Sequence, residues 1–205
     1  MHQPGDHRIC FIGDSFIQGT GDPECRGWTG RISAAACAAG YDLTAYHLGI
    51  RRDTSRDIAA RWETECAARL RQESARYVVF SFGANDMTIE NGSLRVPQRE
   101  SIANFSRMIT QAAARYRTLV VGPAPVGDAA QDARIFDLCA QYAQCAKQAG
   151  VPYLAVARSL AANPAWTREA GMNDGAHPGT GGYRFLADLV AAWPEWWFMP
   201  AKTIA

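Results

Sequence analysis

Residues 8–15 read Arg-Ile-Cys-Phe-Ile-Gly-Asp-Ser, an apolar run that stops at Gly13 and opens into a polar pair. Apolar runs of roughly four to eight residues, bounded by a turn residue, are typical of strands buried on both faces. Residues 77–82 (YVVFSF) show the same pattern, because β-branched or aromatic side chains fill every position except Ser81. We therefore predict two buried strands, at 8–13 and 77–82.

Strand-like and helix-like segments alternate along the rest of the chain. Three more strands are predicted, over residues 43–48, 118–121 and 151–156. Five helices are predicted between the strands and after them, over residues 27–39, 54–71, 98–116, 128–148 and 179–192. Such alternation is typical of a parallel sheet with helices on both faces. The prediction is a single three-layer α/β/α domain over residues 1–205, with a parallel sheet of about five strands.

Composition restricts the class of protein. Of the 205 residues, 48% are hydrophobic and 20% charged, which is the balance of an ordinary soluble globular chain. The 21 Lys and Arg residues are matched by 20 Asp and Glu residues, so the basic face of a nucleic-acid binder is not expected. No apolar stretch approaches the roughly 20 residues that span a bilayer. We predict neither a nucleic-acid nor a membrane partner.

Six cysteines occur without a CxxC pair and without nearby histidines at the spacing of a zinc site. In a chain of this length and apolar content, free thiols in a reducing compartment are the first interpretation. The N-terminal segment is polar and shows no secretion signal. The expectation is a cytoplasmic protein without a metal or an organic cofactor.

Four polar segments stand where the predicted topology places a site. In open parallel α/β sheets, ligands bind beyond the carboxyl ends of the strands. Residues 13–15 (GDS), 48–53 (LGIRRD) and 83–86 (GAND) follow the first three strands, and residues 173–178 (NDGAHP) precede the last helix. The predicted topology brings all four segments to one edge of the sheet.

In this order the four segments resemble the four sequence blocks of the SGNH (GDSL) hydrolase family. Any one block recurs by chance, but four in order over essentially the whole chain form a specific signal. The resemblance implies a flavodoxin-like sheet and esterase, lipase or thioesterase chemistry. It implies that Ser15 is the nucleophile, His177 the base and Asp174 the residue that orients His177. It also implies an oxyanion hole made of the Ser15 and Gly49 amides and the Asn85 side chain.

The chemistry of these residue types agrees with those roles. A serine hydroxyl is a weak nucleophile at neutral pH and needs a hydrogen-bonded base. Asp174, three residues before His177, can reach its imidazole ring and fix the tautomer. Gly49 has no Cβ to block the approach of a ligand to its N–H. Ser15 lacks the Gly-x-Ser-x-Gly elbow of the α/β-hydrolase fold. An ordinary loop serine and a plain turn aspartate remain the alternatives for Ser15 and Asp174.

Arg51, Arg52 and Arg56 crowd the start of a predicted helix, where the helix dipole disfavours cations. The first interpretation is solvated charge balanced by Asp53 and Asp57. The alternative is that Arg51 or Arg52 faces the cleft and binds an anionic part of the substrate. These two arginines are therefore candidate substrate-binding residues.

Several other side chains receive structural interpretations. Asp14 and Asp86 are expected to support their loops through hydrogen bonds. His47 is expected to hydrogen-bond neighbouring backbone at the end of a strand, and His2 and His7 to lie in a mobile terminus. The aromatic tail over residues 193–200 is expected to pack over the core, with a homo-oligomer contact or part of an acyl pocket as alternatives.

The predicted function is hydrolysis of a small-molecule carboxylic ester, or a thioester, through an acyl-Ser15 intermediate. The short loops at 19–27 and 87–97 favour an open cleft and a small or short-chain acyl group. Acyl transfer to an alcohol is the near alternative. A non-catalytic flavodoxin-like module that binds a nucleotide or phosphate is the other, but the first loop carries an acid and no GxGxxG pattern.

Overall fold

The structure is a computed structural model that describes residues 3–199. Five strands form one parallel sheet in the order β2-β1-β3-β6-β7. The strands are β1 (Gln3–Gly13), β2 (Tyr41–Gly49), β3 (Ala75–Ser81), β6 (Arg117–Val121) and β7 (Tyr153–Leu154). Ile9 to Ile12 of β1 are fully buried, as is most of β3, because both strands lie inside the sheet. The predicted five-stranded parallel sheet is confirmed.

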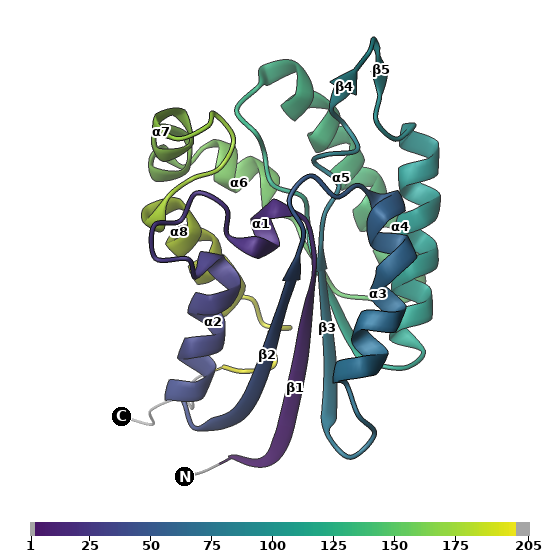
Figure 1. The fold of residues 1–205 in the computed structure, drawn as a ribbon, viewed down its shortest axis with the longest axis vertical. Helices are drawn as coiled ribbons and strands as arrows, with labels where there is room; N and C mark the ends of the chain where they lie inside the picture. The colour runs from purple at the N-terminus through teal and green to yellow at the C-terminus, as the bar shows by residue number, and fades with distance from the viewer. Residues whose placement is uncertain (1–2, 200–205) are drawn as a thin grey trace.

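Helices cover both faces of this sheet (Figure 1). On one face α2 (Gly27–Ala38) packs against α8 (Thr180–Ala191). On the other face α3 (Ser55–Arg69) packs against α4 (Gln98–Ala113), and α5 (Ala129–Ala149) lies beside α4. This arrangement confirms the predicted three-layer α/β fold.

Several short elements escaped the sequence analysis. They are α1 (Ser15–Gln18), the hairpin of β4 (Ile89–Glu90) and β5 (Ser93–Leu94), α6 (Ala157–Ala161) and α7 (Pro164–Met172). A helix of one turn has no readable periodicity, but two signals were present. Asn91-Gly92, with positive φ at both residues, is the turn of a two-residue hairpin. Asn163-Pro164 is a helix start, and Asn163 caps the Ala165 and Trp166 amides.

The aromatic tail packs over the molecule's own core. Trp196 and Phe198 are buried, and the Phe198 ring lies against the rings of His7, Tyr41 and Tyr77. His7 therefore belongs to β1 and not to a mobile terminus, so that expectation was wrong. His2 and Pro200 lie outside the described residues. The described residues of the tail therefore pack at the amino ends of β1, β2 and β3, whereas Ser15 follows the carboxyl end of β1, so they form no part of an acyl pocket beside Ser15.

Two further observations concern the chain as a whole. All six cysteines lie within the described residues, and none of them forms a disulfide. Within residues 3–199, no helix combines the length and the apolar character needed to cross a membrane.

Candidate active site

Ser15 is presented by the turn between β1 and α1. The Asp14 carboxylate caps α1 by accepting a hydrogen bond from the Phe16 amide at 3.0 Å. Gly49, at the end of β2, packs directly on this turn: a Cβ there would lie 2.5 Å from the Asp14 carbonyl oxygen. Only glycine allows that approach, so Gly49 at least fixes the position of the turn that carries Ser15.

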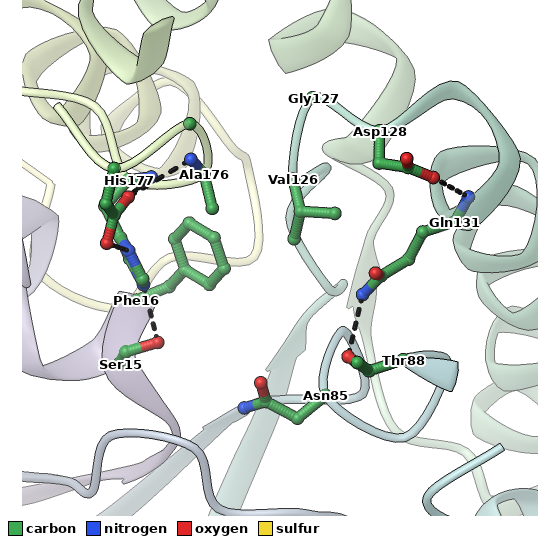
Figure 2. Close-up of a pocket in the computed structure, with 12 residues that line it drawn as sticks. Ser15, Phe16, Asn85, Thr88, Val126, Gly127, Asp128, Gln131, Ala176 and His177 are labelled. Atoms are coloured by element: carbon green, nitrogen blue, oxygen red, sulfur yellow. Dashed lines mark hydrogen bonds and ion pairs between the residues drawn. The ribbon is translucent and has the colours of Figure 1, made fainter. Parts of the chain in front are cut away.

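Ser15, His177 and Asp174 form one hydrogen-bonded chain (Figure 2). His177 Nε2 lies 2.7 Å from Ser15 Oγ, and His177 Nδ1 lies 2.8 Å from Asp174 Oδ2. The other carboxylate oxygen of Asp174 accepts the amides of His177 at 3.0 Å and Ala176 at 3.1 Å. Ser15 and His177 are 4% and 8% exposed, so solvent competes little for their mutual hydrogen bond.

The Asp174 carboxylate sets the tautomer of His177. Burial alone would raise the pKa of Asp174, but hydrogen bonds from the His177 amide and ring and from the Ala176 amide outweigh it and lower the pKa to about 2. An ionised carboxylate only accepts hydrogen bonds, so the Nδ1 proton of His177 must point at it. In the neutral ring, Nε2 is then the free acceptor that faces the Ser15 hydroxyl.

Two side chains that the sequence analysis did not single out hold the His177 loop. Asn173 Nδ2 donates to the His177 carbonyl at 3.0 Å. The Glu169 carboxylate of α7 accepts the amides of Gly179, Gly181 and Gly182 at 2.8–3.1 Å, which fixes the start of α8 directly after the loop. An acidic group is favoured at a helix N-terminus, and the glycines allow its close approach. The Thr-Gly-Gly run at 180–182 was the available signal.

Asn85 reaches the same site from the end of β3. Its Nδ2 donates one hydrogen bond to the Asp53 carbonyl at 2.9 Å, which leaves the second N–H of the amide for another acceptor. The next residue, Asp86, is fully buried and accepts the Ser55 amide at 2.8 Å. Asp86 therefore supports its loop through a hydrogen bond, as the sequence analysis predicted.

A cavity of about 430 Å³ lies in front of Ser15 and His177. Figure 2 shows Ser15, Phe16 and His177 on one side of it, and Thr88 and Gln131 on the other. Gly49 does not line this cavity, whereas Asn85 does. The residues that line the cavity are Ser15, Phe16, Asn85, Thr88, Val126, Gly127, Asp128, Gln131, Asp174, Gly175, Ala176 and His177. These residues all belong to the described part of the chain, and none of them is Lys or Arg.

The two candidate arginines pair with acids at the edge of the site. Arg51 Nη2 lies 3.1 Å from Asp174 Oδ2, the oxygen that also faces the His177 ring. Arg52 Nη2 lies 2.5 Å from Glu90 Oε1 of the hairpin. Both side chains are more than half exposed, at 60% for Arg51 and 68% for Arg52. Neither lines the cavity, and contact with an anionic substrate stays a prediction.

The expected balance of these arginines by Asp53 and Asp57 was wrong. Asp53 pairs with Arg61 at 2.7 Å, and Asp57 accepts the Thr54 amide at 2.8 Å in the capping box of α3. Both acids therefore serve local contacts of the helix. The sequence offered no way to choose between neighbouring acids and the distant Asp174 and Glu90.

His47 packs differently from the expectation. Its ring stacks on Phe11 with centroids 5.4 Å apart and planes 5° apart. Within residues 3–199 the structure gives this ring no hydrogen bond to the backbone. In the same part of the chain, no group of three or more His, Cys, Asp or Glu side chains is arranged to hold a metal ion.

The chain is similar to known proteins in both sequence and fold. The model of the GDSL-like lipase/acylhydrolase family matches residues 11–185, a span that contains all five residues of the proposed triad and oxyanion hole. No curated protein sequence matches the chain significantly.

Among solved structures, the acetylxylan esterase Axe2 from Geobacillus stearothermophilus is 18% identical, with a TM-score of 0.78 over 99% of this chain and 100% of that one. A lipase/acylhydrolase from Enterococcus faecalis is 19% identical, with a TM-score of 0.74 over 96% and 99% of the two chains. At this identity the likeness shows the shared fold, while the family match covers most of the sequence. The chain therefore belongs to the GDSL-like lipase/acylhydrolase family and is an SGNH-type hydrolase that acts on ester bonds.

Proposed function

We propose that this chain hydrolyses small carboxylic esters through an acyl-Ser15 intermediate. The observation that carries the proposal is the hydrogen-bonded chain from Asp174 through His177 to Ser15, at the wall of a cavity. Each link is 2.7–2.8 Å long, which is within reach for proton transfer. Thioesters are the alternative substrates, because the same nucleophile and base serve them.

The residues act in two half-reactions. Ser15 Oγ attacks the ester carbonyl carbon while His177 Nε2 takes the hydroxyl proton. The tetrahedral intermediate collapses, the C–O bond to the alcohol breaks, and His177 returns the proton to the leaving alkoxide. Water then attacks the acyl-Ser15 ester with His177 again as the base, the bond between the acyl carbon and Ser15 Oγ breaks, and His177 returns the proton to Ser15 Oγ as the acid is released. Asp174 holds the ring in place and stabilises the imidazolium in both halves.

The oxyanion is stabilised by donors around Ser15. Asn85 fits this role, because one of its amide protons is held by the Asp53 carbonyl and the other is available at the cavity. The hydrogen bond to Asp53 fixes the amide before substrate arrives, so little reorganisation is needed during reaction. The amides of Ser15 and Gly49 complete the proposed oxyanion hole. For Gly49 the supporting observation is only its packing on the Ser15 turn.

A short acyl group fits the part of the cavity next to Ser15. Phe16 directly follows Ser15, and the Phe16 ring and Ala176 line the same side of the cavity as Ser15 and His177 (Figure 2). Axe2, which shares the fold, is an acetylxylan esterase, and its solved structures include catalytic mutants in which a serine, a histidine or an aspartate is replaced by alanine. We propose an acetyl or similarly short acyl group for this chain.

Covalent labelling tests the proposal directly. An organophosphate should add one phosphoryl group per chain, and peptide mass spectrometry should place that group on Ser15. The Ser15→Ala variant should remain unlabelled, and labelling of the wild-type protein should abolish its turnover of p-nitrophenyl acetate. A folded protein that cleaves this ester while Ser15 stays unmodified would contradict the proposal. Adding an alcohol to the assay and measuring the new ester separates hydrolysis from acyl transfer.

A further inference from the structure

The side of the cavity opposite Ser15 carries polar groups that the proposed reaction does not use. Thr88 follows β3, and Gln131 lies in the first turn of α5 (Figure 2). Their side chains meet there, with Gln131 Nε2 lying 3.0 Å from Thr88 Oγ1. Both residues are half-buried and both line the cavity.

The orientation of the Gln131 amide follows from its partners. Its nitrogen donates to the Ala84 carbonyl at 2.9 Å as well as to Thr88 Oγ1. A backbone carbonyl can only accept, so the nitrogen and not the oxygen of the amide must face Ala84. Both amide protons are then used, and the carbonyl oxygen Oε1 is left as an acceptor without a partner in residues 3–199.

Thr88 is left with the complementary capacity. Its Oγ1 accepts the proton of Gln131, so its own hydroxyl proton must be donated elsewhere. In the described part of the chain this proton has no acceptor. The cavity wall therefore presents one free donor, on Thr88, next to one free acceptor, on Gln131.

These two groups are held rigidly before any substrate binds. The Asp128 side chain caps α5 by accepting a hydrogen bond from the backbone N–H of Gln131 at 2.7 Å, which fixes the backbone of that turn. One turn later, Arg134 donates to the Met87 carbonyl at 3.1 Å and ties α5 to the loop that carries Thr88. A fixed pair of polar groups in a concave site is the usual means of orienting a ligand.

A donor next to an acceptor is complementary to a hydroxyl group, which accepts and donates through one oxygen atom. We propose that Thr88 and Gln131 bind a free hydroxyl group of the alcohol part of the ester. The substrates are therefore short-chain esters of uncharged alcohols that carry at least one further free hydroxyl group. This inference rests on the proposed function, because it places the alcohol across the cavity from Ser15.

The charge of the site agrees with an uncharged alcohol. None of the residues that line the cavity, all of them in the described part of the chain, is Lys or Arg, while the Asp128 carboxylate, which caps α5, is among them. An anionic alcohol would meet this carboxylate without a compensating cation. A purely alkyl alcohol would leave the Thr88 proton and Gln131 Oε1 unpaired as it displaced their water, which costs binding energy.

A pair of matched esters tests the inference. Glycerol 1-acetate and propyl acetate share a three-carbon chain and an acetyl group, and differ only by two hydroxyl groups. We expect wild-type kcat/KM to favour glycerol 1-acetate. The ratio of the two values should fall about three- to tenfold in Thr88→Val and in Gln131→Met, the effect of losing one neutral hydrogen bond. Thr88→Ser, which keeps the hydroxyl group, should leave the ratio near its wild-type value.

The control is Gln144→Met, an identical change at an exposed position of α5 away from the cavity. It should leave the ratio at the wild-type value. If Gln131→Met fails to fold, the Thr88→Val and Thr88→Ser pair still decides. A wild-type preference for propyl acetate, or a ratio unchanged in Thr88→Val, would overturn the inference. If Ser15 is nevertheless labelled by the organophosphate, the proposed function stands; if it is not, the proposed function has failed first.

Discussion

The two sides of the cavity differ in how their hydrogen-bonding groups are used. On the Ser15 side, Ser15, His177 and Asp174 are bonded to one another, and Ser15 and His177 are almost fully buried. On the Gln131 side, a donor on Thr88 and an acceptor on Gln131 lack partners in the described residues, and both side chains are half-buried. A hydrogen-bonded chain of groups suits the transfer of protons between them, whereas groups without partners suit the recognition of a ligand. In the reaction that we propose, the catalytic groups and the groups that recognise the alcohol lie on opposite sides of one cavity.

The largest expected effect comes from breaking the Ser15 side. Ser15→Ala removes the attacking oxygen, and loss of a triad nucleophile lowers kcat by about 10⁶-fold in comparable enzymes. The fold should persist, because the change removes one hydroxyl group and adds no atom that could clash with its neighbours. Turnover of p-nitrophenyl acetate, with circular dichroism as the folding control, measures both. Wild-type-like turnover by the folded variant would show that Ser15 is not the nucleophile.

The sequence predicted the Ser15 side much better than the Gln131 side, for a physical reason. Asp174 and His177 lie three residues apart, and Ser15 ends a clear strand pattern, so each group belongs to a local motif. Thr88 and Gln131 meet across 43 residues of sequence through a single hydrogen bond, which leaves no periodic or spacing signal. Arg51 was recognised, but its partner, 123 residues away, was not. The strands and long helices were predictable because their apolar patterns are repeated over many residues.

A second prediction concerns the cost of building the Ser15 side. Burial raises the pKa of Asp14 to about 7, with repulsion from Asp86 and Asp53 adding to it and the Phe16 amide opposing it. The folded state therefore binds more protons than the unfolded state between pH 4 and 7, so stability falls as pH rises and levels off above about 7. The difference from the ordinary value of 3.8 corresponds to about 4 kcal/mol.

Asp14→Asn should remove this loss of stability at high pH, because the side chain no longer ionises, while it keeps an oxygen that accepts the hydrogen bond from the Phe16 amide. At pH 8 the variant should be more stable than wild type by up to about 4 kcal/mol, and the gain should vanish below pH 4. Urea unfolding at pH 4, 6 and 8 measures the difference. The control is Asp188→Asn, the same change at an exposed position of α8. Equal stability of wild type and Asp14→Asn at pH 8 would show that the buried carboxylate is compensated.

A third prediction places Asn85 on the chemical side of this division, although it comes from the strand that leads to Thr88. Asn85→Ala should lower kcat by roughly 10²–10³-fold with little change in KM, since the lost donor acts on the developing oxyanion. Steady-state kinetics on p-nitrophenyl acetate separate the two parameters. If KM rises while kcat stays intact, Asn85 contributes to ground-state binding of the substrate and does not stabilise the oxyanion.

The smallest expected effect concerns Arg51, which touches the Ser15 side from outside the cavity. Its guanidinium and the His177 ring share one oxygen of Asp174. A positive charge on Arg51 disfavours a second positive charge on the ring, so Arg51→Gln should favour the imidazolium. The acid limb of the kcat/KM profile, which rises as neutral His177 becomes available, should then move to higher pH. An exposed ion pair is worth about 0.2–1 kcal/mol, so the expected displacement is a few tenths of a pH unit.

Arg52→Gln provides the matched control, because Arg52 is the neighbouring residue, is similarly exposed and pairs with Glu90 instead of Asp174. Its profile should coincide with that of wild type, and the displacement in Arg51→Gln should disappear in high salt, which screens exposed charges. The same two variants, assayed at low salt on matched neutral and anionic esters, test whether either arginine also binds substrate. Equal displacement in both variants would mean that general surface charge acts on His177 and that the contact with Asp174 has no separate effect. A selective loss on the anionic ester would instead give Arg51 or Arg52 a place in recognition, contrary to the uncharged alcohol inferred from the Gln131 side.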